Sequence, residues 1–183
     1  MALPTLIVVS GPPGAGKTTL AHRIAREMGC PAVIRDEIKQ GMTQAAAGDE
    51  PGGSDSLNIR TLKAFFDVLA LLLRAGVTLV AEAAFQHHVW QPNLEPLAEL
   101  ARIRVIRCTV EAATAHGRIA HRAARDPRRA AHADHELLKA IDSGGHRLDD
   151  FRWIRMDLPT LTVDTTHGYD PSLPEIVAFG QAR

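Results

Sequence analysis

The chain has 183 residues, of which 45% are hydrophobic, enough for one α/β domain with a single core and too apolar for a disordered chain. Lys+Arg and Asp+Glu number 21 each, and this balance argues against non-specific wrapping of long nucleic acid. Cys30 and Cys108 have no C-x-x-C partner, which predicts buried thiols and not a disulfide framework or a zinc site. No signal peptide fits before the first expected strand, and the longest apolar stretch contains Asp67 and is too short to span a bilayer. We therefore expect a cytoplasmic protein.

The first expected elements enclose a glycine-rich loop. Residues 6–10 form a short apolar run that predicts a buried strand, and residues 19–28 carry apolar side chains at four-residue spacing, as a helix does. Between them, Gly11–Thr18 matches the phosphate-loop pattern G-x-x-x-x-G-K-[ST]. Glycines allow the backbone to approach a ligand closely, and backbone N–H groups with the positive end of the helix form an anion nest. Lys17 adds a charge for the β- and γ-phosphates, and Thr18 offers a hydroxyl to Mg²⁺.

A second short strand, residues 32–34, leads into a helix that extends through Met42. Asp36, at the start of this helix, is either its N-cap or the group that accepts the proton of an acceptor hydroxyl near the γ-phosphate. The neighbouring Arg35 and Lys39 favour the second interpretation, because a cap alone does not explain them. Residues 45–56 are small, polar and rich in glycine, which predicts a mobile loop.

The remainder of the chain alternates helices and strands. A long helix has Ile59, Leu62, Phe66, Leu69 and Leu73 on one stripe and ends at Gly76. The next expected elements are strand 77–82, loop 83–90, a short helix over 92–101, strand 103–110, helix 111–125, helix 132–142, strand 161–164 and helix 173–179. This alternation predicts a parallel sheet with helices on both faces and right-handed crossovers.

In such a sheet, ligands bind beyond the carboxyl ends of the strands. Lys17, Asp36, Glu82 and Asp164 follow or occupy four of these ends, which predicts that they converge on one edge. Glu82 is suited to hold the water shell of Mg²⁺, because this ion keeps several waters and few direct carboxylates. The alternative is a solvated carboxylate at the end of a strand.

Arginines are dense from His116 to His132, and Arg118 and Arg122 share one helix face. Arginine grips phosphate oxygens with two hydrogen bonds, so beside a phosphate loop this stretch predicts a lid, and not only a solvated helix face. The nine histidines offer no convincing metal-ligand set, and no Ser-His-Asp nucleophile pattern is present.

Taken together, Gly11–Thr18, Arg35–Lys39, the arginine-studded stretch and Val163–Thr166 resemble the small P-loop kinases. The resemblance is to the group that contains the polynucleotide 5′-hydroxyl kinase domain, chloramphenicol phosphotransferase and zeta toxins. It implies a three-layer P-loop NTPase sandwich with a five-stranded parallel sheet of order 2-3-1-4-5 and an Arg-rich lid. It also implies that Asp36 is the general base and that Lys39 contacts the acceptor. Where many of these kinases have Arg-His-Pro-Gly-His in the lid, this chain has Arg-Arg-Ala-Ala-His at positions 128–132.

The expected function is transfer of the γ-phosphate of ATP, with Mg²⁺, to a hydroxyl of a small molecule or nucleotide. The alternatives are a polynucleotide 5′-hydroxyl kinase and, in another class, a nucleotide-binding switch or regulatory ATPase. We expect one domain over residues 1–183 with a lid at about 118–135. The expected site residues are Lys17, Asp36, Arg122 and Arg125 for catalysis; Gly11, Pro13, Gly14, Ala15, Gly16, Lys17, Thr18, Thr19, Arg118 and Thr165 for the nucleotide; Arg35, Asp36, Lys39 and Glu82 for the acceptor; and Thr18 and Glu82 for the metal.

Overall fold

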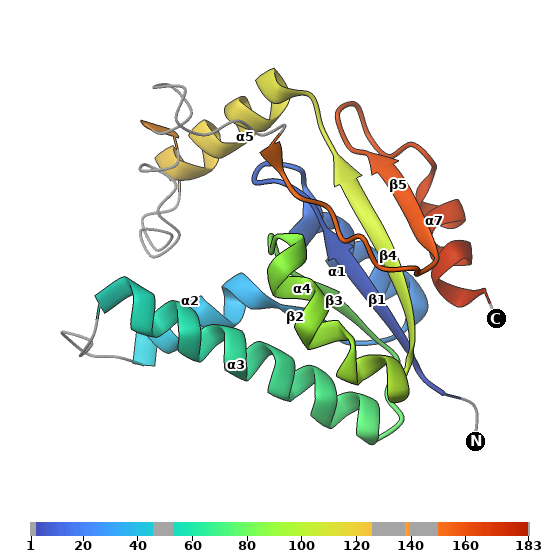
Figure 1. Cartoon of the computed structure of the whole chain (residues 1–183). Helices are drawn as coiled ribbons and strands as arrows, with labels where there is room; N and C mark the ends of the chain where they lie inside the picture. Colours follow the sequence, from blue (N-terminus) through green and yellow to red (C-terminus); the bar gives the residue numbers. More distant parts are fainter. Residues whose placement is uncertain (1–2, 46–52, 126–137, 140–149, 183) are drawn as a thin grey trace.

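A five-stranded parallel sheet forms the middle layer of the molecule (Figure 1). The computed structural model describes residues 3–45, 53–125, 138–139 and 150–182, without the side chains of residues 53–55 and 125. The strands are β1 Thr5–Ser10, β2 Ala32–Ile34, β3 Leu79–Glu82, β4 Arg102–Thr109 and β5 Thr160–Asp164, in the order β2-β3-β1-β4-β5. The sheet order expected from the resemblance is therefore confirmed, and with it the three-layer P-loop fold.

Helices cover both faces of this sheet. They are α1 Lys17–Met28, α2 Arg35–Ala45, α3 Gly53–Arg74, α4 His87–Leu94, α5 Ala112–Arg125 and α7 Leu173–Gln181, with a 3₁₀ turn at Pro96–Glu99. In Figure 1, α3 and α4 lie in front of the sheet, and α5 projects beyond its upper edge. Among the helices of the described ranges, none is long and apolar enough to cross a membrane.

The central strand β1 shows why the layers form. All six of its residues are buried, and successive side chains point to opposite faces. Leu6 and Val8 pack in the cluster that contains α3 and α4, whereas Ile7 and Val9 pack in the cluster that contains α1 and α7. Each of these fully buried side chains contributes roughly 1.5–3 kcal/mol through loss of water contact. The apolar run therefore specifies a strand covered on both sides.

Two expectations about α3 are corrected. The helix begins at Gly53, so residues 53–56 are helical and do not belong to the expected loop, whose residues 46–52 lie outside the described part. Ile59, expected on the buried stripe, is 68% exposed, because the buried face is formed by Phe65, Phe66, Leu69 and Leu73. The expected helix 132–142 also falls mostly outside the described residues, although positions 138–139 are helical.

The segment after β3 differs most from expectation. The expected short helix over 92–101 is wrong, because α4 begins at His87 and carries Pro92 inside it. Proline is favoured in the first turn of a helix, so the sequence suggested that a helix begins at Pro92. Burial decides otherwise: Trp90 is fully buried, its ring packs against Phe85, and its indole N–H donates to Ser10 Oγ at 3.2 Å. These contacts place the first turn of the helix before the proline.

Candidate active site

The loop between β1 and α1 is packed so closely that two of its glycines leave no space for a side chain. A Cβ on Gly11 would overlap the carbonyl oxygen of Cys108 in β4. A Cβ on Gly14, whose φ is 78°, would lie 2.7 Å from the carbonyl oxygen of Ala115 in α5. Burial raises the pKa of the Cys108 thiol to about 12, so this cysteine is an inert core residue, as expected. Strand β4 and helix α5 thus hold the loop in one conformation.

A pocket of about 270 Å³ opens over this loop and the start of α1. Its lining residues are Gly14, Gly16, Lys17, Thr18, Thr19 and Arg122. Lys17 is only 7% exposed, and its Nζ donates to the carbonyl oxygen of Pro12 at 2.9 Å. Arg122 reaches the same pocket from α5, so two cations and the positive end of α1 surround a space suited to phosphate groups. We call this space the phosphate-loop pocket.

Thr18 and Glu82, both expected at the metal, are in direct contact. The Thr18 hydroxyl donates to Glu82 Oε2 at 2.9 Å, which joins the first turn of α1 to the end of β3. Glu82 is only 4% exposed. Burial raises the pKa of its carboxyl, and the charge of Lys17 and the Thr18 hydrogen bond oppose this rise.

This pair of oxygen donors fits Mg²⁺. The ion prefers one or two protein oxygens and completes its shell with water and substrate phosphates. A hydroxyl and a buried carboxylate beside the phosphate-loop pocket meet that requirement. In the described part of the chain, no group of three or more His, Cys, Asp or Glu side chains could hold a metal, which leaves no separate protein-only metal cage there.

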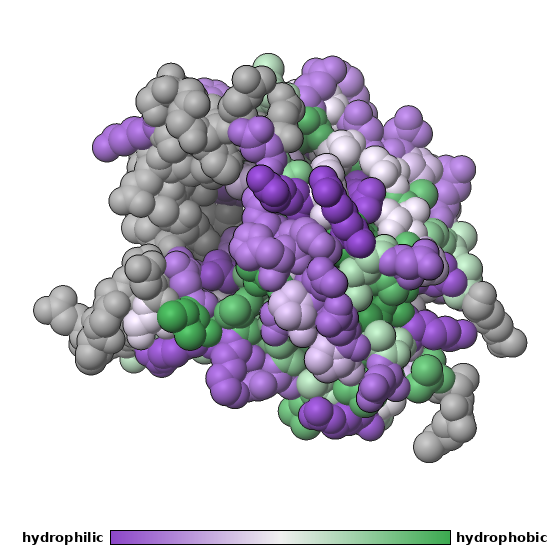
Figure 2. All heavy atoms as spheres, in the orientation of Figure 1, coloured by the Kyte–Doolittle hydropathy of each residue, from purple (hydrophilic) through white to green (hydrophobic). Residues whose placement is uncertain are grey.

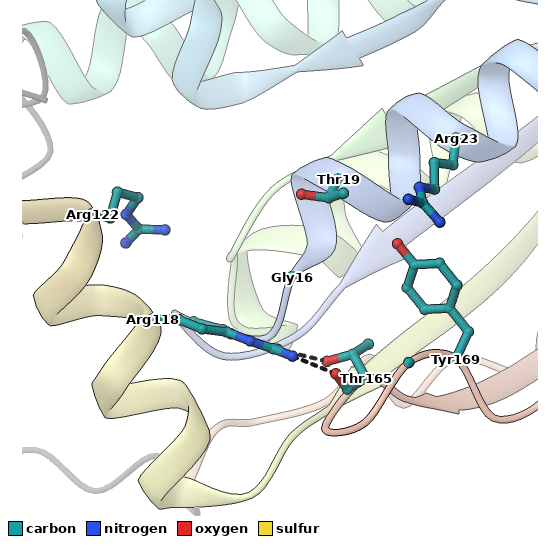
Figure 3. Close-up of a pocket in the computed structure, with 9 residues that line it drawn as sticks. Gly16, Thr19, Arg23, Arg118, Arg122, Thr165 and Tyr169 are labelled. Atoms are coloured by element: carbon teal, nitrogen blue, oxygen red, sulfur yellow. Dashed lines mark hydrogen bonds between the residues drawn. The ribbon is translucent and has the colours of Figure 1, made fainter. Parts of the chain in front are cut away.

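Arg118 connects α5 to the phosphate loop (Figure 3). Its guanidinium donates to the carbonyl oxygen of Gly14 at 3.3 Å, to Thr165 Oγ1 at 3.1 Å and to the carbonyl oxygens of Thr165 and Thr166. The Thr165 hydroxyl is buried and lies 3.1 Å from the carbonyl oxygens of both Ala15 and Thr109. Thr165 is therefore engaged by protein groups, and it positions Arg118 at the edge of the loop.

Beside Arg118 lies a larger pocket of about 470 Å³, within the range of small-molecule sites. We call it the lateral pocket; it is lined by Gly14, Gly16, Thr19, Arg23, Arg118, Arg122, Thr165, Gly168 and Tyr169. The guanidinium of Arg23 lies 5.6 Å from the centroid of the Tyr169 ring, and Figure 3 shows this pair across the pocket from Arg122. Sequence reasoning missed Arg23, Gly168 and Tyr169, since no motif marks them.

Three of the expected acceptor residues, Arg35, Asp36 and Lys39, lie in the first two turns of α2. Because α2 begins at Arg35, Asp36 is its second residue, and the alternative that Asp36 is the N-cap is wrong. Arg35 donates to Asp36 Oδ1 at 2.9 Å and to Asn58 Oδ1 at 2.8 Å, and its guanidinium lies 5.8 Å from the centroid of the Phe85 ring. The Asp36 side chain is 51% exposed. Lys39 is 7% exposed, and its pKa is lowered by burial and by the charge of Arg35, whereas Asp36 raises it.

Asp164 stabilises its own loop. Its Oδ1 accepts a hydrogen bond of 2.7 Å from the backbone N–H of Thr166, which holds the pKa of the Asp164 carboxyl below its usual range. Arg118 is bonded to the carbonyl oxygen of Thr166, so this turn supports the nucleotide side of the site. The Arg125 side chain and the expected lid residues 126–135 lie outside the described residues.

Comparisons with known proteins agree with this geometry. The sequence profile of the AAA domain family matches residues 6–143. A candidate kinase from Chloroflexus aurantiacus J-10-fl is 26% identical, with a TM-score of 0.76 over 97% of this chain and 96% of that one. A sugar kinase from Janibacter sp. HTCC2649 is 17% identical, with a TM-score of 0.64 over 96% and 94% of the two chains. The Mycobacterium tuberculosis APS kinase CysC, solved with AMPPNP and APS, is 17% identical, with a TM-score of 0.60 over 100% of both chains. No curated protein matched the sequence.

Proposed function

The chain belongs to the AAA domain family and has the fold of the small P-loop kinases, and from this premise we propose that it transfers the γ-phosphate of ATP to a hydroxyl of a small molecule or nucleotide. The observation that carries the proposal is the phosphate-loop pocket, because Lys17, Thr18 and Arg122 line it and Asp36 lies in the first turn of α2, directly after β2 of the same sheet. The free thiols of Cys30 and Cys108 support the expectation of a reducing, cytoplasmic setting.

Each residue has a role that its position supports. The loop backbone and Lys17 bind the β- and γ-phosphates, and the lateral pocket beside Arg118 receives the nucleoside. Asp36 accepts the proton of the acceptor hydroxyl as its oxygen forms a bond to the γ-phosphorus and the bond to the oxygen of the departing diphosphate breaks. Arg122, which lines both pockets, stabilises the charge on the transferred group.

Thr18 and Glu82 would hold Mg²⁺ beside these phosphates. When bound, the ion supplies positive charge to the phosphate oxygens. The buried Glu82 carboxylate also orients the Thr18 hydroxyl, so the oxygen donors stand in place before nucleotide arrives.

The test is Lys17→Ala with Lys63→Ala as the matched control, since the Lys63 side chain is exposed and pairs with Asp67 four residues away. Lys17→Ala should abolish nucleotide binding and ATP-dependent phosphate transfer in a screen of nucleosides, sugars, oligonucleotides and antibiotics. The variant should stay folded, with a thermal midpoint only several degrees below that of Lys63→Ala, because the charged hydrogen bond to Pro12 is worth about 1.5–3 kcal/mol. Unchanged turnover in Lys17→Ala would contradict the proposed phosphate site.

A further inference from the structure

A third pocket lies away from the phosphate loop, between the start of α4 and the residues that lead into β5. It has a volume of about 430 Å³ and is lined by Gln86, His87, His88, Asp150, Arg152 and Arg155. We call it the α4 pocket. Hydrophilic residues gather over the middle of the face shown in Figure 2, where α4 and the chain that enters β5 cross in Figure 1.

Backbone and side-chain hydrogen bonds join the two walls of this pocket. The N–H of His87 donates to the carbonyl oxygen of Arg152 at 2.9 Å, and the N–H of Arg152 donates to Gln86 Oε1 at 2.6 Å. The N–H of Arg155 donates to His87 Nδ1 at 3.3 Å. Because Nδ1 accepts this bond, the neutral His87 ring carries its proton on Nε2 and can donate it to a ligand. The walls are therefore preorganised.

The α4 pocket carries excess positive charge. In the described part of the chain, neither Arg152 nor Arg155 forms an ion pair with a carboxylate, and Asp150 is the single acidic residue of the lining. The positive end of the α4 dipole lies at the same wall, where His87 begins the helix. Two guanidinium groups that no described carboxylate neutralises favour a carboxylate or phosphate as occupant.

One residue, Phe85, connects the wall of the α4 pocket to the expected acceptor residues of α2. Phe85 precedes Gln86 in the chain, and the Arg35 guanidinium lies 5.8 Å from the centroid of its ring. The same guanidinium donates to Asp36 Oδ1. The lining shares no residue with the phosphate-loop pocket or the lateral pocket, so an anion here does not compete with ATP.

We infer that the acceptor is a small hydroxyl-bearing acid whose carboxylate or phosphate ester is held in the α4 pocket by Arg152, Arg155 and His87. This inference rests on the proposed function for the transfer step, while the anion site itself is testable by binding alone. Asp150 accepts a hydrogen bond from a hydroxyl of such a ligand, which a purely anionic ligand could not supply.

The experiment is equilibrium titration of the full chain after the phosphate loop has been saturated with AMPPNP and Mg²⁺, so that added anions cannot enter that loop. The probes are inorganic phosphate, glycerol 3-phosphate and gluconate, with glycerol and sorbitol as their neutral counterparts. We expect binding of the anions and not of the neutral polyols. Preference for the phosphate probes would assign a phosphate ester, and preference for gluconate would assign a carboxylate.

The variants are Arg152→Gln, Arg155→Gln and the double change, with Arg74→Gln as the control, because Arg74 is exposed at the far end of α3. Each loss of a charge-assisted contact should weaken anion binding by about 10- to 100-fold, without effect on AMPPNP affinity. Arg74→Gln should change neither. Equal binding of sorbitol and gluconate, or full anion affinity in the double variant, overturns the inference.

Failure of the proposed function would have a different signature. Anions would still bind in the α4 pocket and depend on Arg152 and Arg155, but no acid would accept phosphate from ATP. Conversely, if neutral acceptors received phosphate and no anion bound in the α4 pocket, the proposed kinase activity would stand. Only the inference that the acceptor is an acid would be rejected.

Discussion

Asp36 and Glu37 are adjacent acids in the first turn of α2, and the proposed function assigns the catalytic role to Asp36 alone. Asp36 accepts a hydrogen bond from Arg35, whose guanidinium lies near Phe85, whereas Glu37 is paired with His22 of α1 at 2.8 Å. Asp36→Asn retains the size and polarity of the side chain but removes the base. Phosphate transfer should therefore fall by about 10²–10⁴-fold, with nucleotide affinity little changed. Steady-state kinetics and AMPPNP titration measure the two effects.

Glu37→Gln is the matched control, since it makes the same change of carboxylate to amide one residue along the same helix. It should retain transfer within a few-fold. If Asp36→Asn also stayed within a few-fold of the unchanged chain, Asp36 would only be a carboxylate that stabilises the positive end of α2.

Glu82 gives a pH-dependent prediction. Burial raises the pKa of its carboxyl above the reference value of 4.5, so the folded state holds this proton more tightly than the unfolded state. The free energy of unfolding is therefore reduced as the pH rises through 4.5 toward the folded pKa. Glu82→Gln cannot ionise at this position, so its free energy of unfolding should not fall in this way. Without Mg²⁺, the variant should melt at a higher temperature than the unchanged chain at pH 7, and the two should converge below pH 4.5.

The same substitution should cost function. Saturating nucleotide with Mg²⁺ stabilises a binding protein by about 2.7 kcal/mol at 100 times Kd, roughly 5–10 °C for a chain of this size. In Glu82→Gln, the additional rise in thermal midpoint that Mg²⁺ gives over AMPPNP alone should be mostly lost. Thermal denaturation with AMPPNP, in the presence and absence of Mg²⁺, measures it. A variant with the full Mg²⁺-dependent gain would exclude Glu82 from the metal site.

At the scale of elements, α5 is held against the phosphate loop by Arg118, which bonds to Gly14 and to the turn after β5. A lysine cannot span these acceptors, because it has one ammonium group in place of a planar fork. Arg118→Lys should weaken AMPPNP binding by about 10- to 100-fold, equivalent to one or two charge-assisted hydrogen bonds. His121→Gln, exposed on the same helix, should have no effect. Equal affinities in both variants would mean that α5 packs independently of Arg118.

Sequence patterns correctly predicted the elements that are specified by residues close together in the chain. The phosphate loop could be predicted because its glycines, Lys17 and Thr18 occupy fixed positions between a strand and a helix. The start of α4 could not, because contacts of Trp90 with residues distant in sequence override the signal of Pro92. The α4 pocket was also missed in large part. Arg152 and Arg155 lie in a stretch that is neither helix nor strand. Hydrogen bonds to α4 and the burial of the intervening Ile154 place them, and both are contacts with residues distant in sequence.

At the scale of the whole molecule, the sheet brings distant parts of the chain to one edge. Parallel strands with covered faces followed from the alternation of elements, and the strand order followed from the resemblance. As a consequence, Lys17, Asp36 and Glu82 all follow or end neighbouring strands, β1, β2 and β3. The α4 pocket, where we propose that the acid group of the acceptor binds, could not be predicted in this way. Its lining residues lie in loops and at the start of a helix, where no periodicity or motif marks them.

The overall charge leads to a last prediction, which separates small acceptors from polynucleotides. Lys+Arg and Asp+Glu are balanced at 21 each, and Lys17 and Arg122 line the phosphate-loop pocket, where bound nucleotide would occupy them. The α4 pocket, with two arginines, offers contacts for one or two phosphates. For a labelled 5′-hydroxyl oligonucleotide, the logarithm of affinity should therefore fall against the logarithm of salt with a slope no steeper than about −1.4, at roughly −0.7 per phosphate contact.

The measurement is a salt-titrated binding assay with the phosphate loop saturated by AMPPNP and Mg²⁺, so that Lys17 and Arg122 are occupied, repeated with Arg152→Gln. We expect weak oligonucleotide binding at physiological salt, and a smaller slope in the variant if a phosphate occupies the α4 pocket. Submicromolar affinity with a slope of about −2 or steeper requires three or more phosphate contacts. Such a result would reject the small acceptor and favour a polynucleotide 5′-hydroxyl kinase, because a chain without net charge reaches that slope only through a track of cations built for a polymer.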